Sequence, residues 1–531
     1  MELTDIRHLL NSNNTPNSIE GVALKAKLAE LTTLSNRLRA QLEEVEDQIA
    51  QYRGVLSIMR SMPCEILSLV FSFAFEVPLP LDRAGRDVLL TFGLVCRNWR
   101  NASLLNHQFW CGLIISPGDL RDRESYEKIV TWFGRGGHFP KSLYLLSPLG
   151  DPDANGLLTS DTTLKLLTQG PVLDHLSFEC EDTTVLDKFV HSFYRVEGVE
   201  PLKRPWDSLR SLEVIISGGV VDGWYFHTRG TSKNIFFSLP PIISFSLRFP
   251  NQHIAFDSDL ASVPSLKLGI PQSLLGRLKS LDITCGWKGP HILSILQSCR
   301  RLESLTVDMD GMPFDEVIRP SMPLAQPPQF LPIRLAKLRV LRLQNQAKTL
   351  RLLDFLITPA LTTLDISMQG CDASAKQPNC DWLVNAIIGL IQARSHCEDT
   401  LRTLRLHDMT FNDPGDLIAI LAVQPALRSL TLDKINLRIF SWFWQSPITR
   451  DTLANLVNLS VLQISLKDSY NIMKEIFAFF KGWVPRHCEV CLSFQEALIP
   501  DTNAAIRCWK GMYPELLSSW EDMGISFSIV P

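Results

Sequence analysis

The sequence predicts a mixed α/β protein, in which a long N-terminal helix and a small helical unit precede an array of strand-and-helix repeats. Three observations favour this fold class. Residues 24–59 place apolar side chains alternately four and three positions apart, residues 62–113 hold two apolar runs at helical spacing, and from about residue 139 onward one short strand pattern keeps returning. A chain of 531 residues is too long for one compact core, so we expect several domains or an elongated array.

The first predicted element is a heptad helix over residues 21–60, after a disordered lead over residues 1–20 that contains Pro16 and an Asn-rich stretch. Ser35 is a polar residue within its apolar seam. The apolar members of the seam are Leu24, Leu28, Leu31, Leu38, Leu42, Val45, Ile49, Tyr52, Leu56 and Met59.

The charges along this helix are segregated by sign. Basic residues come first and acidic residues follow: Lys25, Lys27, Arg37 and Arg39, then Glu43, Glu44, Glu46 and Asp47. An antiparallel pairing would set opposite charges against each other. Two arrangements remain open, an amphipathic helix folded back on the body of the same chain or a homodimer through residues 24–59, and the dimer would raise avidity by presenting two binding surfaces.

The second predicted element is a helical unit over residues 61–115. Pro63 suits a first helical turn because its missing N–H costs nothing there. Two apolar runs at helical spacing follow it: Ile66, Leu67, Val70, Phe71 and Phe73, then Leu90, Leu94, Val95 and Trp99. Two helices with so much apolar surface cannot bury it alone, so we expect a partner to cover part of it. An ordinary helical hairpin packed on its own domain is the alternative.

Three short motifs in this segment stand in the order that F-box sequences have. They are Met62, Pro63, Glu65, Ile66 and Leu67, then Val95, Cys96 and Trp99, then Phe109 and Trp110. The segment therefore resembles an F-box, although Met62 replaces the usual Leu and residues 77–88 lengthen the connection between the helices. The resemblance implies binding to a Skp-type adaptor and a cullin-RING ubiquitin ligase. It places Pro63, Ile66, Leu67, Val95 and Trp99 at or directly under the adaptor interface.

The third predicted element is a repeat array over residues 139–531, closed by a C-terminal cap. Ten copies of a pattern with apolar residues at positions one, four and six begin at Leu173, Leu209, Ile242, Leu278, Leu302, Leu338, Leu361, Leu401, Leu427 and Leu459. Helical runs precede several copies, so each unit holds a strand and a helix that cannot bury an apolar face alone. Such units stack into a solenoid; strands in a flat sheet are the alternative.

The pattern resembles leucine-rich repeats, and with the preceding unit the chain looks like the F-box and leucine-rich-repeat class of substrate receptors. The usual Asn or Cys after the last strand leucine is mostly missing. Met409, Ile435 and Gln369 stand in that place. We therefore expect an irregular solenoid with uneven curvature.

Two rows of residues between the strand leucines should share one face of the array. The first row is Ser177, Glu213, Ser246, Asp282, Thr306, Arg342, Asp365, Arg405, Thr431 and Gln463; the second is Glu179, Ile215, Arg248, Thr284, Asp308, Gln344, Ser367, His407, Asp433 and Ser465. We expect Arg342, Arg405 and His407 to take acidic or phosphorylated groups of a substrate protein. A solvated polar face with no particular ligand is the alternative. Three carboxylates complete the candidate substrate residues, Asp282 and Asp308 for basic groups and Asp365 between the cations.

Composition restricts the partners and the compartment. A net charge of −4 with 20% charged residues provides no basic field for nucleic acid or an acidic membrane. The twelve cysteines are scattered, mostly within apolar runs, as in a reducing compartment. The N-terminus lacks a basic start followed by an apolar core, and the apolar run from Trp382 is too short to cross a membrane. We expect a location in the cytoplasm or nucleus.

Signals for catalysis, metal and cofactor are weak. His487, Cys488 and Cys491 form a His-Cys-x-x-Cys cluster on an expected strand, but zinc sites need four ligands. The motifs GxxxxGK[ST], GxSxG and HExxH are absent from the sequence. Two further segments remain open in role: a Pro-rich loop over residues 311–332, and the aromatic cluster of residues 438–446, which is either core or an exposed anchor. We expect no enzyme, no bound metal and no cofactor.

The leading hypothesis is therefore a non-catalytic substrate receptor of an SCF-type ubiquitin ligase. Its rivals are a scaffold that binds the adaptor without promoting degradation, a leucine-rich-repeat regulator of a small GTPase, and a cysteine hydrolase using Cys488 beside His487. Binding of adaptor without cullin favours the scaffold, accelerated GTP hydrolysis favours the regulator, and covalent labelling of the Cys488 thiol favours the hydrolase.

Overall fold

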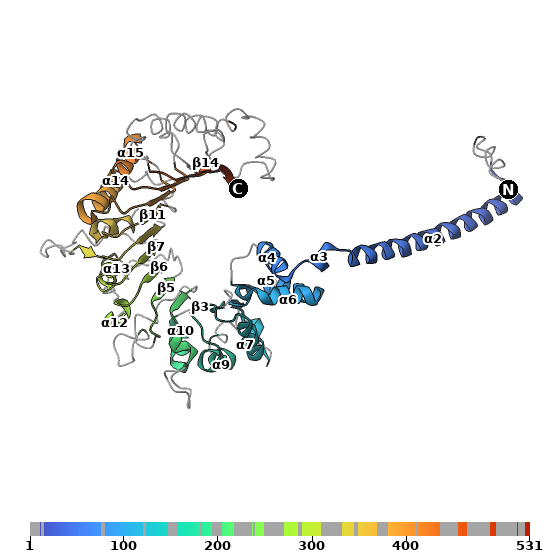
Figure 1. The fold of residues 1–531 in the computed structure, drawn as a ribbon, viewed down its shortest axis with the longest axis horizontal. Coiled ribbons are helices and arrows are strands. Elements are labelled where there is room, and N and C mark those ends of the chain that lie inside the picture. Colours follow the sequence, from blue (N-terminus) through green and yellow to red (C-terminus); the bar gives the residue numbers. More distant parts are fainter. Residues whose placement is uncertain are drawn as a thin grey trace. The chain divides into compact units, whose positions relative to one another are not determined.

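The fold is that of a computed structural model. It describes residues 11, 15–75, 80–120, 124–146, 158, 160–180, 183–193, 204–216, 236, 239–248, 270–284, 289–308, 332–344, 349–368, 381–409, 411, 413–435, 455–464, 489–494, 518 and 526–530. The protein is mixed α/β, with a long N-terminal helix and a large parallel sheet (Figure 1), as predicted.

The chain divides into two compact units. The helical unit comprises Met1–Pro78 and Ala84–Asn106, and the sheet unit comprises Leu79–Arg83 and His107–Pro531. This boundary differs from the expected helical unit over residues 61–115. Phe109 and Trp110 lie in the sheet unit, where both are buried and Trp110 packs on Trp132 with ring centroids 4.6 Å apart.

The long helix α2 (Ser18–Val55) begins at a capping box. The Asn17 side chain accepts hydrogen bonds from the Ile19 and Glu20 amides, and the Glu20 carboxylate accepts one from the Asn17 amide. The helix therefore starts inside the expected disordered lead, whose first ten residues lie outside the described part. It ends before Leu56, so Leu56 and the Met59 of α3 (Ile58–Ser61) do not extend the seam.

Three shorter helices follow: α4 (Cys64–Ala74), α5 (Arg83–Val95) and α6 (Arg97–Leu105). Pro63 is the N-cap of α4 rather than its first helical residue. In α6, the side-chain Nδ2 of Asn98 donates a hydrogen bond to the Met62 backbone carbonyl at 3.0 Å. The Asn98 side-chain Oδ1 accepts one from the Cys64 thiol at 2.7 Å. These bonds tie the start of α4 to α6.

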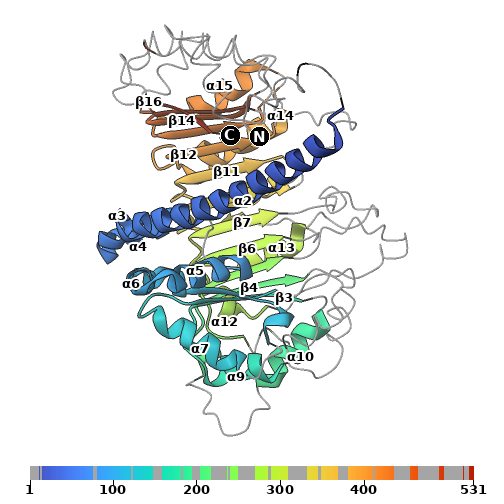
Figure 2. The same cartoon turned by 90° about the vertical axis from the view of Figure 1, so that its right-hand side faces the viewer.

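The sheet unit contains a fourteen-stranded parallel sheet whose strands follow chain order, omitting β8 and β10 (Figure 2). Its strands are β1 (Gly112–Ile115), β2 (Ser142–Leu145), β3 (His175–Cys180), β4 (Ser211–Ile216), β5 (Ser244–Arg248), β6 (Ser280–Thr284), β7 (Ser304–Asp308), β9 (Val340–Gln344), β11 (Thr363–Ser367), β12 (Thr403–His407), β13 (Ser429–Asp433), β14 (Asn458–Ile464), β15 (Glu489–Phe494) and β16 (Ser526–Val530). A separate two-stranded sheet pairs β8 (Ile333–Arg334) with β10 (Leu356–Ile357).

The predicted strand pattern accounts for β3 to β7, β9 and β11 to β14. In each of these repeats an apolar side chain just before the strand is almost fully buried: Leu173, Leu209, Ile242, Leu278, Leu302, Leu338, Leu361, Leu401, Leu427 and Leu456. The residue after this apolar side chain accepts, through its backbone carbonyl, hydrogen bonds from two backbone amides of the following repeat. The Arg402 carbonyl, for example, accepts from the Arg428 and Ser429 amides. The last copy therefore begins at Leu456 and not at Leu459, because Leu459 pairs with Leu430.

Strands flank the ten repeats at both ends, namely β1 and β2 before them and β15 and β16 after them. The expected strand around Cys491 is thus present as β15. At the first strand, Leu81 forms an isolated bridge with Leu113, and its carbonyl accepts from the Ile114 amide at 3.1 Å. A Cβ on Gly112 would stand 2.7 Å from the Pro80 backbone, so only glycine admits this close approach.

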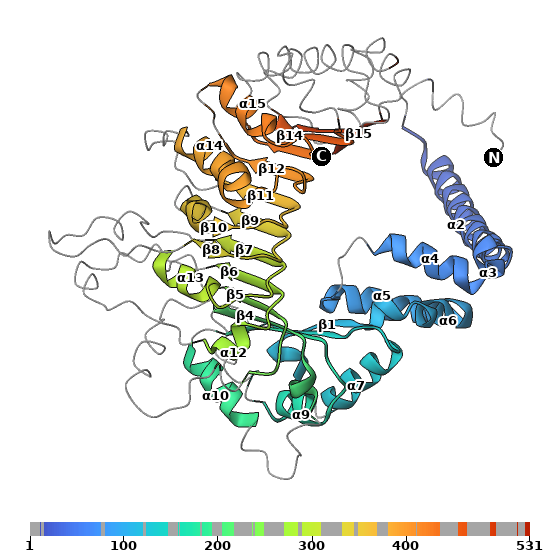
Figure 3. The same ribbon diagram turned by 60° about the vertical axis from the view of Figure 1, so that its left-hand side comes forward.

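Helices connect the strands, and α13, α14 and α15 lie on one face of the sheet (Figure 3). The helices of this unit are α7 (Ser125–Arg135), α9 (Asp161–Gln169), α10 (Thr183–Phe193), α12 (Gln272–Leu275), α13 (Gly289–Leu296), α14 (Asp381–Ile388) and α15 (Pro414–Ala422). Shorter helical turns are η1 (His107–Trp110), η2 (Pro117–Leu120), η4 (Pro205–Ser208), η9 (Thr349–Phe355) and η10 (Gly389–Ser395). Along each strand of the first nine repeats the residues of the two predicted rows alternate with buried apolar residues, so the two sets lie on opposite faces of the sheet. We call the face that carries the two rows the polar face.

Several expectations fall on residues outside the described part. They concern residues 311–331 of the Pro-rich loop, the aromatic cluster of residues 438–446, and Gln369, Ser465, His487 and Cys488. In the described part, no single helix is long and apolar enough to cross a membrane; Ser18–Ser61 and Cys64–Ala74 reach that measure only together, across a 97° bend.

Candidate functional site

The first candidate surface is the exposed apolar face of α4. Ile66, Leu69, Val70 and Phe73 recur at helical spacing and are all exposed, with Phe73 retaining 76% of its accessible surface. The opposite face of the same helix carries the buried Leu67 and Phe71. Helix α4 is thus apolar on both sides, and only one side is covered within the described residues.

Helix α5 has the same two-sided character. Gly85 and Leu89 are buried, whereas Leu90 and Leu94 point away from that side and are exposed, Leu94 at 77%. Val88 and Val95 are exposed as well. We name the exposed apolar residues of α4 and α5 the apolar faces, namely Ile66, Leu69, Val70, Phe73, Val88, Leu90, Leu94 and Val95.

An aromatic core holds these helices together beneath the apolar faces. The Phe71 ring lies 4.5 Å from that of Phe92 and 5.1 Å from that of Trp99, and the Phe92 and Trp99 rings meet edge to face at 5.7 Å. Phe75 adds a fourth ring, 5.6 Å from Phe92. Because the rings come from α4, α5 and α6, the exposed side chains stand on a packed support.

The structure separates the five candidate adaptor residues into two groups. Pro63, Ile66 and Val95 are exposed, whereas Leu67 is fully buried and Trp99 is half-buried in the aromatic core. Sequence reasoning did not single out Leu69 and Val88, although both continue the helical apolar spacing. Such a surface can bind an apolar partner and holds no group suited to catalysis.

The second candidate surface is the polar face of the sheet. The pairing places Ser177, Glu213, Ser246, Asp282, Thr306, Arg342, Asp365, Arg405 and Thr431 side by side on successive strands. The first predicted row is therefore in register across nine strands. Its tenth member is Ser460, not Gln463, because Thr431 pairs with Ser460.

Asp433, a member of the second predicted row, is the centre of a charged cluster on β11, β12 and β13. Its Oδ2 atom lies 3.0 Å from Arg405 Nη2 and 3.5 Å from His407 Nε2, and its side chain is almost fully buried. Ser367 Oγ lies 2.9 Å from His407 Nδ1. Sequence reasoning placed Asp433 in the second row but not among the candidate binding residues. The sequence could have indicated Asp433, because it occupies the same position in its repeat as His407 does in the neighbouring repeat.

Acidic and basic side chains are interspersed on the polar face, and Arg248, Arg342 and Arg405 each have an acidic neighbour. Arg342 Nε lies 3.9 Å from Asp365 Oδ2, and Arg248 Nη2 lies 3.1 Å from Glu213 Oε1. Glu213 also accepts a hydrogen bond from Ser177 Oγ at 2.8 Å. Each of these ion pairs joins opposite charges on neighbouring strands.

Burial raises the pKa of two carboxyl groups on this face above the ordinary aspartate value. At Asp282 the loss of hydration outweighs the nearby Arg248 and Arg342. At Asp365 it outweighs Arg405, Arg342 and His407. Both aspartates are half-buried, whereas Asp308, the third candidate carboxylate, is buried. Arg342 and Arg405 extend to solvent and are the accessible cations of the row.

The order Ser367, His407, Asp433 resembles the relay of a serine hydrolase, but the surroundings disfavour that role. The Asp433 carboxylate is bonded to Arg405, and its 3.5 Å separation from His407 is too long for a strong hydrogen bond. Side chains at equal register on neighbouring strands meet regardless of function. The cluster can bind a charged group, and its geometry does not assemble an activated nucleophile.

The described residues contain no group of three or more His, Cys, Asp or Glu side chains placed to hold a metal ion. Of the His487, Cys488 and Cys491 cluster only Cys491 falls in the described ranges, half-buried in β15. A comparison with known protein families finds no match, and a comparison with curated proteins finds none either.

Proposed function

We propose that this chain is the substrate-recognition subunit of an SCF-type cullin-RING ubiquitin ligase. In this proposal the F-box-like unit of α4 to α6 binds a Skp-type adaptor, and the polar face of the sheet binds a protein substrate. The chain itself is not an enzyme. It accelerates ubiquitin transfer by holding the substrate near catalytic subunits.

The observation that carries the proposal is the pair of apolar faces on α4 and α5. Soluble proteins rarely leave contiguous large apolar side chains exposed without a binding role. Here they stand on helices whose other sides are already packed around Phe71, Phe92 and Trp99. Of the five candidate adaptor residues, Pro63, Ile66 and Val95 belong to the exposed part, whereas Leu67 is buried and Trp99 is half-buried.

For the sheet unit we propose an irregular leucine-rich-repeat solenoid. In-register parallel strands, buried leucines at one position of each repeat and helices on one face support this reading. Met409 and Ile435 are buried at the position where the family usually has Asn or Cys. Apolar packing then replaces the usual side-chain hydrogen bonds between repeats, which favours uneven curvature.

The substrate is proposed to meet the polar face at Asp282, Asp308, Arg342, Asp365, Arg405 and His407. Because acidic and basic side chains are interspersed there, a complementary partner carries both acidic and basic groups rather than one long block of either sign. Each cation would exchange an intramolecular partner for one on the substrate, which favours selectivity over raw affinity.

Affinity capture with the full chain tests the adaptor interface. The variant Ile66→Asp with Phe73→Asp places charge on the apolar face without touching the aromatic core, and we expect it to lose both adaptor and cullin. Val172→Asp is the matched control, since Val172 is exposed in the sheet unit, and it should capture both. Equal adaptor capture by all three chains would sink the proposal, whereas adaptor without cullin in the unmodified chain would favour the scaffold.

The substrate surface is tested by proteins that remain bound to the Ile66→Asp, Phe73→Asp variant. Replacing Arg342 and Arg405 by glutamine should remove them, because the two exposed cations are lost while side-chain size is roughly kept. Arg402→Gln with Arg428→Gln is the control, since both arginines are exposed just outside the row. An unchanged set of bound proteins in the Arg342, Arg405 variant would refute the assignment of the polar face.

A further inference from the structure

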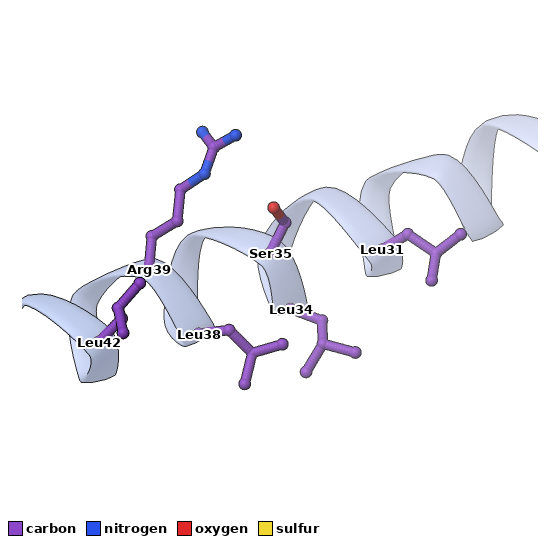
Figure 4. A pocket seen from close by; sticks show the side chains of 6 residues that line it. All are labelled: Leu31, Leu34, Ser35, Leu38, Arg39 and Leu42. Carbon is purple, nitrogen blue, oxygen red and sulfur yellow. The ribbon is translucent and has the colours of Figure 1, made fainter.

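Helix α2 presents an apolar stripe that no residue described in the structure covers. None of the side chains of this 38-residue helix is buried. An open groove on it is lined by Leu31, Leu34, Ser35, Leu38, Arg39 and Leu42. Figure 4 shows Leu31, Leu34 and Leu38 pointing to the same side of the helix.

A helix of this kind needs a packing partner in water. Helical stability in proteins comes mainly from burying an apolar face and only weakly from residue propensity. The α2 stripe repeats with the alternating spacing of a two-stranded seam, in which Leu28, Ser35, Leu42 and Ile49 take the a positions and Leu24, Leu31, Leu38, Val45 and Tyr52 the d positions. The occupant of the stripe is therefore another helix.

We propose that the occupant is α2 of a second copy of this chain, paired antiparallel so that Ser18 of one helix lies opposite Val55 of the other. This is the register in which the two helices overlap along their whole length, from the capping box to the last helical residue. A coiled-coil homodimer follows, and it does not depend on the ligase proposal.

The same register also aligns the apolar layers. In an antiparallel pair an a residue meets a d residue of the partner. Here Leu24 meets Ile49, Leu28 meets Val45, and Leu31 meets Leu42. Ser35 meets Leu38 at the centre, so the polar residue packs against a leucine instead of a second serine. Each layer occurs twice by symmetry.

Charge complementarity fixes the register of the antiparallel pair, and the segregation of basic residues before acidic ones along α2 favours that orientation over a parallel one. Lys25 and Glu46 each follow a d residue, so both lie on the e edge of the seam. Reversing one helix turns its e edge toward the e edge of the partner, and in this register Lys25 approaches Glu46 on both flanks. Shifting the pairing by one heptad in either direction brings Lys25 to Arg39 or to Arg53 instead, which is repulsive.

Sedimentation of the full chain over a wide concentration range tests the dimer. The unmodified chain should sediment as a dimer, and Leu31→Lys with Leu42→Lys should make it monomeric, because these residues form two layers of the seam. Thr33→Lys with Ala40→Lys is the matched control, since both residues are exposed on the far side of the helix from the seam. A monomeric unmodified chain, or a dimer that survives the leucine changes, would overturn the proposal.

A charge swap tests the orientation. Lys25→Glu should weaken self-association by about tenfold, because two exposed ion pairs turn repulsive. Adding Glu46→Lys should restore it, since the pairs then re-form with reversed signs. In a parallel dimer Lys25 would face Glu20 and Glu46 would face Gln41, so the second substitution would give no rescue. Far-UV circular dichroism of each variant checks that helix content is kept, and failure of the rescue would overturn the antiparallel register.

Discussion

Phe71→Ala and Phe73→Ala should separate the stability of the helical unit from its binding surface. The two residues lie two positions apart on α4 and have the same side chain. Phe71 retains only 2% of its accessible surface and packs on Phe92 and Trp99, whereas Phe73 is mostly exposed. Only the first substitution leaves a cavity.

The expected magnitudes follow from this burial. Truncating a buried phenylalanine costs about 3–5 kcal/mol, because transfer and cavity terms add. Phe73 buries roughly a quarter of its side-chain surface of about 200 Å². At about 25 cal/mol per Å², this burial contributes about 1 kcal/mol to the free energy of unfolding. Alanine recovers part of that through its higher helix propensity. The Phe73→Ala change should therefore be nearly neutral for folding.

Amide hydrogen exchange in peptides covering α4 to α6 measures the difference. Since about 1.4 kcal/mol corresponds to a tenfold change in an opening equilibrium, Phe71→Ala should speed exchange by a factor of about one hundred or more. Phe73→Ala should leave exchange nearly unchanged and reduce adaptor capture. Similar exchange in the two variants would refute the assignment of the buried and exposed faces of α4.

Four further predictions concern the sheet and the thiols. Because the pKa of Asp365 is raised in the folded state, its ionised carboxylate destabilises the fold at pH 7. Asp365→Asn should therefore raise the urea midpoint at pH 7, and the gain should shrink toward pH 4, where the native carboxyl is protonated. A difference between the two proteins that stays constant with pH would contradict this. Leu456→Ala should destabilise the sheet by about 2–5 kcal/mol in denaturant and Leu462→Ala by clearly less, the reverse order contradicting the register of β14. Burial raises the pKa of Cys299 to about 12 and that of Cys397 to about 11, so peptide mapping at pH 8 should find the exposed Cys96 alkylated before either of them. Ser367 should stay unlabelled by a fluorophosphonate, and its modification would show that Ser367, His407 and Asp433 do form an activated nucleophile.

The strand array was largely predictable because one spacing, repeated many times, sets both burial and register. The last copy shows the limit. Leu456, Leu459 and Val461 fit the pattern, and so do Leu459, Leu462 and Ile464. Only the backbone bonds from the Val457 and Asn458 amides to the Arg428 carbonyl decide between them.

The helical unit was predictable in its elements but not in its faces. Helix α4 is apolar on every side except the one that carries Glu65, Ser68 and Ser72, so spacing alone could not tell that Phe71 is buried and Phe73 exposed. That choice depends on where α5 and α6 bring Phe92 and Trp99. Likewise the seam spacing continues through Leu56 and Met59, but Leu56 is the C-cap of α2, and the backbone leaves the helical path at Ser57, which is the N-cap of α3.

Charge partners were the least predictable part of the polar face. The rows identified which side chains lie side by side, yet Arg405 could have paired across the strand to either neighbour. The structure pairs it with Asp433 at 3.0 Å and leaves the carboxyl of Asp365 with a raised pKa. Side-chain length and local hydration decide such pairings, and neither is visible in a spacing pattern.

The bridge between Leu81 and Leu113 has a bearing on solubility. The outer rim of β1 would otherwise offer unpaired amides and carbonyls as a template on which a strand from another molecule could grow. The segment around Leu81 occupies part of that rim, and the tight fit of Pro80 over Gly112 holds it there. Pro80 and Leu81 thus cover part of the sheet edge from which such growth would start.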